Sequence, residues 1–253
     1  MPEKVELYPL RTPVIKPGDD LVGALVRAAG RAGGFKGGDV VVVSSKAVSS
    51  WQGRLLELGG ISPSKRALSL ARRSGLEPSF VEVVLREADR VLGCTRGAIL
   101  TLKDGLLLAN AGVDCSNVPP GKVSLLPANP SQTARRIAQE ITRRTGARVG
   151  VIISDSAVRP MRKGTVGQAL GWFLIEPVED CRGRHDLFGR RLKITFRAVA
   201  DQLATAAQLL MGEAGERVPA VLVRGAVRLG RGKHSPLIPA RRCLYLSSLR
   251  VRV

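Results

Sequence analysis

The sequence predicts an α+β protein, that is, a mixed α/β fold built around buried strands, and three observations support this class. The run Val40–Val43 is apolar at every position, as in a strand covered on both faces. Stretches with helical apolar spacing alternate with strand-like stretches along the chain. No internal repeat, long linker or composition break divides the 253 residues, so we expect one domain over residues 1–253.

In chain order, the first half predicts a strand at 5–10, a helix at 19–32 led by two aspartates, and a strand within 37–49. Ser44, Ser45 and Lys46 stand at the exit of that last strand, where open α/β sheets usually contact ligands. Helices are expected at 62–75, closed by Gly75, and at 78–93. Two short strands are expected about Lys103-Asp104-Gly105.

The second half predicts a capped helix at 129–146 and a second buried strand that begins near 147 and ends at Asp155. A loop rich in Gly, Arg and Asp follows at 179–191, then a strand at 192–199, a helix at 200–212 and a strand at 219–226. Residues 228–242 carry too much Gly, Pro and Arg to assign.

Composition indicates a globular protein with an anionic ligand. The hydrophobic fraction of 44% is ample for a core, and the formal net charge of +19 attracts polyanions. Arg is nevertheless spread over the whole chain, and aromatic residues make up only 4%, so few base-stacking platforms are available. A basic groove for a phosphorylated small molecule is therefore favoured over nucleic-acid binding, which the charge leaves open.

Several other classes are disfavoured. The four cysteines form no C-x-x-C pair, and the chain has only two histidines, which argues against a disulfide framework, a zinc site or a Ser-His-Asp triad. No apolar run is long enough for a membrane span, and MPEKVELYPLRTP lacks the apolar core of a secretory signal. We expect a cytoplasmic protein without a membrane partner. No G-x-x-x-x-G-K-[ST] loop occurs, since the Gly232-Lys233 pair has the wrong follower.

Two isolated acids are candidates for chemistry. Asp114 lies in ANAGVDCSN and Asp155 in IISDS, each at a predicted strand exit among small or polar residues. Two carboxylates with a hydroxyl such as that of Ser156 are suitable ligands for Mg²⁺ or Mn²⁺, which also bridges phosphate oxygens. The alternative is that each aspartate caps a turn or helix.

Two further acids are ambiguous. Glu213 follows a predicted helix C-terminus, where the helix dipole disfavours a carboxylate unless something positive holds it, and this favours a ligand role. Asp186 stands among arginines and is expected to make ordinary ion pairs.

Taken together, several segments resemble the coenzyme F420-0:L-glutamate ligase family. They recur in family order from about residue 5 to residue 228: LYPLRTPVIKPGDDL, GDVVVVSSKAVS with QGR, NAGVDCSN, ARVGVIISDS with RP, RKGTVGQALG, GRHDLFGRRLKIT, ADQLATAAQLLMGEAGE and PAVLVRG. The resemblance implies an intertwined homodimer and a GTP-dependent ligase that joins L-glutamate to the deazaflavin precursor F420-0 through an acyl phosphate. It also implies Mg²⁺ or Mn²⁺, with a monovalent cation as an optional addition. Because an acyl phosphate has to be shielded from water, the glycines at 164, 167 and 171 are expected to shape a close-fitting loop.

Matching positions imply the site residues. Asp114 and Asp155 would bind one metal and be catalytic, and Ser156 and Glu213 would bind a second metal. The residues implied around the guanine nucleotide are Thr12, Pro13, Val14, Ile15, Ser45, Lys46, Ser50, Asn117, Met211, Gly212, Ala214, Gly215, Glu216, Arg217 and Val218. For the acceptor or its phosphate, we select the basic side chains Arg159, Arg162, Lys163 and Arg224.

The chain also departs from the family pattern. Ser50 and Gln52 stand where the family usually has Lys and Glu, Ser131 and Gln202 stand where it has acidic residues, and Val158 replaces a Gly. These departures keep alternatives open. The chain could be a divergent ligase with another acceptor or amine, or a non-catalytic protein that binds nucleotide or nucleic acid.

Overall fold

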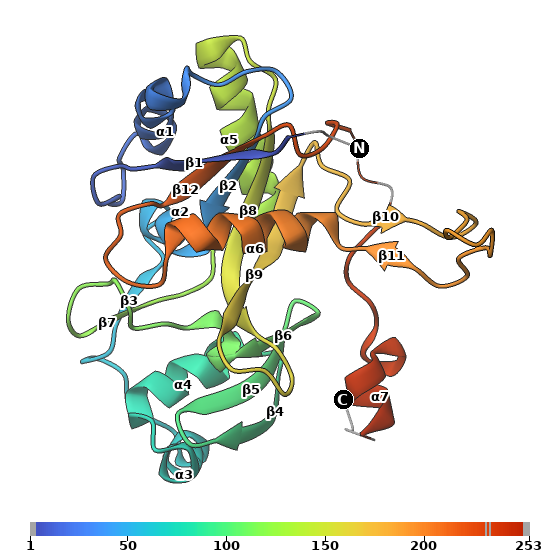
Figure 1. Ribbon diagram of the computed structural model, residues 1–253. Helices are drawn as coiled ribbons and strands as arrows, with labels where there is room; N and C mark the ends of the chain where they lie inside the picture. Colours follow the sequence, from blue (N-terminus) through green and yellow to red (C-terminus); the bar gives the residue numbers. More distant parts are fainter. Residues whose placement is uncertain (1–3, 231, 233, 250–253) are drawn as a thin grey trace.

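A five-stranded mixed sheet forms the centre of the structure, a computed structural model that describes residues 4–230, 232 and 234–249 (Figure 1). Its strand order is β1-β12-β2-β8-β9, in which β2 and β8 are parallel and the other neighbouring pairs are antiparallel. The strands are β1 (Glu6–Leu10), β2 (Val40–Ser44), β8 (Gly150–Val158), β9 (Thr165–Phe173) and β12 (Ala220–Arg224). The combination of this sheet with separate helices and smaller sheets confirms the predicted α+β class.

Helices cover both faces of the sheet, which accounts for the unbroken apolar run in β2. Val41 and Val43 belong to a core shared with α1 and α5, whereas Val40 and Val42 belong to a core shared with α6. Figure 1 shows α6 crossing the front of the sheet, with α1 and α5 in the upper part of the view. Successive side chains of a strand point to opposite faces, so a strand between two helical layers needs apolar residues throughout. The helices are α1 (Leu21–Ala29), α5 (Pro130–Thr145) and α6 (Val199–Met211), and the short helix η1 (Gly30–Ala32) follows α1.

A third core lies beside the central sheet, around two helices and a three-stranded sheet of order β4-β5-β6. Its elements are α3 (Lys65–Ser74), α4 (Pro78–Glu87), β4 (Arg90–Thr95), β5 (Ala98–Lys103) and β6 (Leu106–Ala109). The hairpin predicted about Lys103-Asp104-Gly105 is confirmed by the pairing of β5 with β6. The end of α3 at Gly75, which has a φ of 70°, is also confirmed.

Two predicted elements have different boundaries. The helix expected at 78–93 ends at Glu87, because the following residues pair with β5 and form β4. The strand expected within 37–49 ends at Ser44, whose Oγ accepts a hydrogen bond from the Ala47 amide and caps the helix α2 (Ser45–Trp51). The polar residues after β2 therefore lie in the first turn of a helix.

The prediction of a close-fitting loop at the glycines 164, 167 and 171 is wrong, since most of this segment is strand β9. A Cβ on Gly167 would lie 2.3 Å from the Ala204 backbone in α6, and one on Gly171 would lie 2.4 Å from the Ser131 amide in α5. These two glycines let helices approach the sheet closely from both faces. The end of β8 was also misplaced, because the strand continues past Asp155.

The remaining elements are short. They are β3 (Leu55–Glu57), η2 (Asn110–Gly112), β7 (Lys122–Ser124), β10 (Glu179–Asp180), β11 (Phe196–Arg197), η3 (Ala240–Arg242) and α7 (Leu244–Ser248). The strand predicted at 192–199 is thus reduced to β11. Asp186 accepts hydrogen bonds from the Phe188 and Arg190 amides, and no ion pair to it is found among the described residues. Lys233, of the Gly232-Lys233 pair, lies outside the described residues. The single domain over residues 1–253 stays a prediction. No helix in the described part of the chain is long and apolar enough to cross a membrane.

Candidate active site

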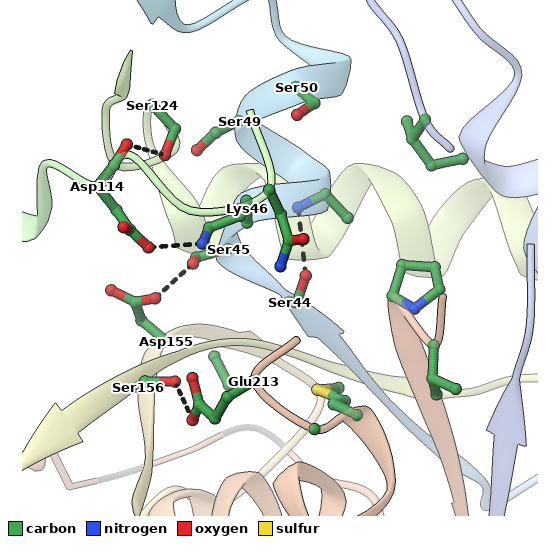
Figure 2. Close-up of a pocket in the computed structure, with 18 of the residues that line it drawn as sticks. Ser44, Ser45, Lys46, Ser49, Ser50, Asp114, Ser124, Asp155, Ser156 and Glu213 are labelled. Atoms are coloured by element: carbon green, nitrogen blue, oxygen red, sulfur yellow. Dashed lines mark hydrogen bonds and ion pairs between the residues drawn. The ribbon is translucent and has the colours of Figure 1, made fainter. Parts of the chain in front are cut away.

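A cavity of about 570 Å³ opens at the edge of the central sheet where β2 ends. Because β2 and β8 are parallel, with Ser44 opposite Ser154, the residues that follow these two in the chain reach the same edge of the sheet. Those two residues are Ser45 and Asp155, and Ser45 Oγ donates a hydrogen bond to Asp155 Oδ1 at 2.7 Å (Figure 2). The lining also includes residues of the η2 turn, of the segments after β1 and α6, and of the stretch at 124–126.

The hydrogen bonds to the Asp155 carboxylate offset only part of the cost of burying its negative charge. Burial raises its pKa above the ordinary value of 3.8, although the hydrogen bonds from Ser45 and from the Ser156 amide act in the opposite direction. The pairing of β8 with β9 shifts register between Ile153 and Ser154, so β9 has one extra residue opposite this part of β8, two residues before Asp155. Bulges often redirect side chains beside active sites. A cation placed here would stabilise the charged form of Asp155.

The small residues before Asp114 form a left-handed turn. Asn110, Ala111 and Gly112 have φ values of 53°, 52° and 73°, a conformation that costs a residue with a side chain roughly 1–2 kcal/mol. The turn is held in place because Asn110 Oδ1 accepts from the Ile99 amide and Thr101 Oγ1 from the Ala111 amide, each at 2.9 Å. Backbone strain of this kind concentrates at functional sites. Here the turn carries the chain from β6 to Asp114 at the cavity wall.

Asp114 is paired with a lysine from the first turn of α2. Lys46 Nζ donates to Asp114 Oδ2 at 2.5 Å, and Ser116 donates to the same carboxylate through its amide and its hydroxyl, both at 2.8 Å. Burial raises the pKa of Asp114, but the bonds from Lys46 and Ser116 outweigh it and hold that pKa below its usual value. Asp114 and Asp155 thus line one cavity but differ in charge compensation.

Glu213 and Ser156 form a second polar group on the cavity wall. Ser156 Oγ donates to Glu213 Oε1 at 2.8 Å, as Figure 2 shows. Thr165 Oγ1 donates to the same oxygen at 2.8 Å, and Gln208 Nε2 does so as well. Gln208 and Thr165 were missed by sequence reasoning, because a polar residue inside a helix or strand carries no signal that it faces a site.

Most of the residues predicted around the nucleotide line the cavity. Asn117 Nδ2 donates to the Ala214 carbonyl at 3.0 Å, and the Thr12 amide donates to the Arg217 carbonyl at 3.4 Å, so distant segments meet here. Glu216 is absent from the lining, and its carboxylate accepts from the Ala214 amide. The predicted residues in the lining are Thr12, Pro13, Val14, Ile15, Ser45, Lys46, Ser50, Asn117, Met211, Gly212, Ala214, Gly215, Arg217 and Val218.

The basic residues selected for the acceptor are outside the cavity. Arg159, Arg162 and Lys163 are exposed in the connection between β8 and β9 and do not line it. Arg224 is at the opposite end of the sheet, where it pairs with the buried Asp39 at 2.8 Å. Its guanidinium is held there by Asp39 and by the carbonyls of Ala32 and Gly34, an environment that does not favour the predicted acceptor contact. The charge of a residue does not show at which end of the sheet its side chain lies.

Comparison with known proteins places the chain in a family. The model of the F420-0:gamma-glutamyl ligase family matches residues 9–225. The chain belongs to this family. Proteins named coenzyme F420:L-glutamate ligase are similar over most of its length. That of Methanocaldococcus jannaschii is 42% identical over 93% of this chain and 94% of its own, and that of Methanopyrus kandleri is 43% identical over 88% and 86%. That of Archaeoglobus fulgidus is 40% identical over 95% and 98%.

As an F420-0:gamma-glutamyl ligase family member, the protein is a ligase, and its donor set can be compared with what a divalent metal needs. No group of three or more His, Cys, Asp or Glu side chains converges as a complete metal site among the described residues. Mg²⁺ commonly takes only one or two carboxylates and completes its shell with phosphate oxygens and water. Asp114, Asp155, Ser156 and Glu213 therefore fit a metal that is bound together with a nucleotide.

Two departures from the usual family pattern lie close to this site. Ser50 lines the cavity, so a cation expected there is replaced by a small hydroxyl. Gln52 has a structural role, because its amide donates to the Ala128 carbonyl and to Thr133 and accepts from the Ala128 amide. These bonds connect α2 to the start of α5. Gln202 and Val158 are exposed and do not line the cavity.

Proposed function

We propose that this protein joins L-glutamate to F420-0 at the expense of GTP, with Mg²⁺ or Mn²⁺. The observation that carries the proposal is the convergence of Asp114, Asp155 and Lys46 on one cavity beside the segments at 12–15 and 211–218. Family membership supplies the reaction class, and the names of the relatives supply the substrates.

The proposed reaction has two steps. The precursor carboxylate attacks the γ-phosphorus of GTP, which forms an acyl phosphate and releases GDP. The glutamate amine then attacks the acyl carbon, loses a proton and expels phosphate, which leaves an amide. Phosphoryl transfer needs mainly positioning and charge neutralisation.

The chain's own residues supply most of these needs. Asp114 and Asp155 would hold one metal, and Ser156 and Glu213 a second. When bound, such ions neutralise charge on the phosphates. The Lys46 ammonium, at the start of α2, would pair with a phosphate oxygen. Asn117 holds the 211–218 segment against the cavity through the Ala214 carbonyl, which shapes the nucleotide side of the site.

The decisive experiment is incubation of the protein with GTP, Mn²⁺, L-glutamate and F420-0, followed by mass analysis. We expect a product heavier by one glutamyl residue, with one GDP formed per amide. Asp155→Asn is the matched control, since the amide keeps the shape of the side chain and removes its charge. A folded wild-type protein that binds Mn²⁺ and GDP but adds no glutamyl residue would contradict the proposal.

The same assay separates the alternatives. Amide formation with another carboxylic acid or amine would identify a divergent ligase, whereas Mn²⁺-GDP binding without GTP turnover would identify a non-catalytic protein. Retention of RNA that weakens steeply with salt would favour nucleic acid. The homodimer, a monovalent cation and the cytoplasmic location stay predictions.

A further inference from the structure

Glu213 lies one residue after the Gly212 cap of α6, in a position that does not by itself favour a fixed carboxylate. The C-terminal end of a helix carries partial negative charge, which repels an acidic side chain. Gly212 has a φ of 70° and adds no side-chain contact of its own. An exposed glutamate here would sample many rotamers unless other residues held it.

Three side chains from different elements hold this carboxylate by one oxygen. Ser156 on β8, Thr165 on β9 and Gln208 on α6 all donate to Glu213 Oε1. Gln208 Nε2 also lies 3.1 Å from Ser156 Oγ and 3.2 Å from Thr165 Oγ1, so the donors contact one another. Within the described residues, Glu213 Oε2 accepts no such bond. One oxygen is thus immobilised and the other remains available for a cation.

We propose that Thr165 and Gln208 are positioning residues that fix Glu213 for a divalent metal ion. The proposal rests on the proposed function, since that function supplies the metal. Under this proposal, neither residue contacts a substrate. They act through Glu213 and Ser156, in the way that hydrogen-bonded partners orient the ligands of a metal and strengthen its binding.

Packing does not explain the arrangement. The contact between β9 and α6 is already secured by Gly167, which allows the Ala204 backbone to approach, and by Thr205, whose Oγ1 donates to the Gly167 carbonyl at 3.0 Å. Thr205 lies on the same helix as Gln208 but makes no bond to Glu213. It is therefore a matched control for the loss of a threonine hydroxyl at this interface.

The test measures Mn²⁺ binding directly, by electron paramagnetic resonance of free Mn²⁺ at saturating GDP. Thr165→Val keeps the shape and removes the donor, and Gln208→Leu removes the amide. We expect each to weaken Mn²⁺ binding by about 10- to 100-fold, with Thr165→Ser restoring it to near the wild-type value. Thr205→Val should lower thermal stability while leaving Mn²⁺ affinity unchanged.

Each outcome decides the question. Mn²⁺ affinity that stays within about twofold of wild type in both Thr165→Val and Gln208→Leu would overturn the proposal, as would an equal loss in Thr205→Val or a wild-type protein that binds no Mn²⁺. Thermal unfolding of each variant separates a binding defect from unfolding. Because binding is measured without turnover, a wild type that binds Mn²⁺ but adds no glutamate would refute the proposed function alone.

Discussion

Lys46 Nζ lies 2.5 Å from Asp114 Oδ2, although the two residues are 68 positions apart in the chain. The ammonium therefore neutralises one of the two aspartates of the cavity, while the donors to Asp155 among the described residues are a hydroxyl and an amide. This difference makes the two carboxylates respond differently to substitution and pH.

Replacing Lys46 by Met should weaken nucleotide binding. The change removes the cation proposed to contact a phosphate, and a hydrogen bond to a charged group contributes about 1.5–3 kcal/mol, or roughly 10- to 100-fold in affinity. Isothermal titration with Mn²⁺-GDP measures the loss, and Lys46→Arg, which keeps the charge, should lose less. Equal affinity in the Met variant and the wild type would remove Lys46 from the nucleotide site.

Asp155→Asn should abolish turnover and stabilise the fold at neutral pH. Burial raises the pKa of Asp155 above 3.8, so the charged carboxylate increasingly destabilises the folded state as pH rises above 3.8 and through the folded-state pKa. At pH 7 the variant should melt at a higher temperature, by about 2–4 °C for each kcal/mol recovered. At pH 3, where the carboxyl is neutral in both states, calorimetry should find equal melting temperatures. A gain that persists at pH 3 would show another cause.

Gly167→Ala should destabilise the protein. The new Cβ would lie 2.3 Å from the Ala204 backbone, and an overpacked core of this kind typically costs about 1–3 kcal/mol. Urea denaturation measures the free energy of unfolding. Gly59→Ala is the control, because no atom lies within 4 Å of its added Cβ. Similar stability of the two variants would mean that α6 moves away from β9 without cost.

Arg224→Met should lower stability without affecting the acceptor. The substitution leaves Asp39, only 1% exposed, buried without its cation, which typically costs about 3–5 kcal/mol. Below its melting temperature, the variant should keep the wild-type KM for F420-0. Arg159→Met, at an exposed position, should stay within about 0.5 kcal/mol of wild-type stability. A raised KM in Arg224→Met, with stability intact, would return Arg224 to the site.

Local signals in the sequence were sufficient for much of the fold. Four consecutive valines identify β2, Gly75 ends α3, and the Lys103-Asp104-Gly105 turn identifies a hairpin, since each signal acts within a few residues. β4 and β9 were missed because their strand character depends on partners elsewhere in the chain. The glycines of β9 in particular resemble those of a loop until the helices that pack on them are known.

The same distinction between local signals and long-range contacts applies to the residues of the site. Asp114, Asp155 and the segments at 12–15 and 211–218 could be selected by likeness to a family, and the structure brings them to one cavity. The ion pair of Lys46 with Asp114 and the donors on Glu213 could not, because they depend on the angle at which separate elements meet. For the same reason, the sequence could not show that Arg224 pairs with Asp39 at the opposite end of the sheet.

Asp114, which follows the turn from Asn110 to Gly112, and Asp155 are anchored beside two different hydrophobic cores. Val113, beside Asp114, is buried with α3 and α4, whereas Ile153, near Asp155, is buried in the central sheet. The seam between these two cores is the cavity, which both carboxylates line. A bound cation that contacts both carboxylates would close the seam, and amide hydrogen exchange at the backbone on either side of it should then slow together.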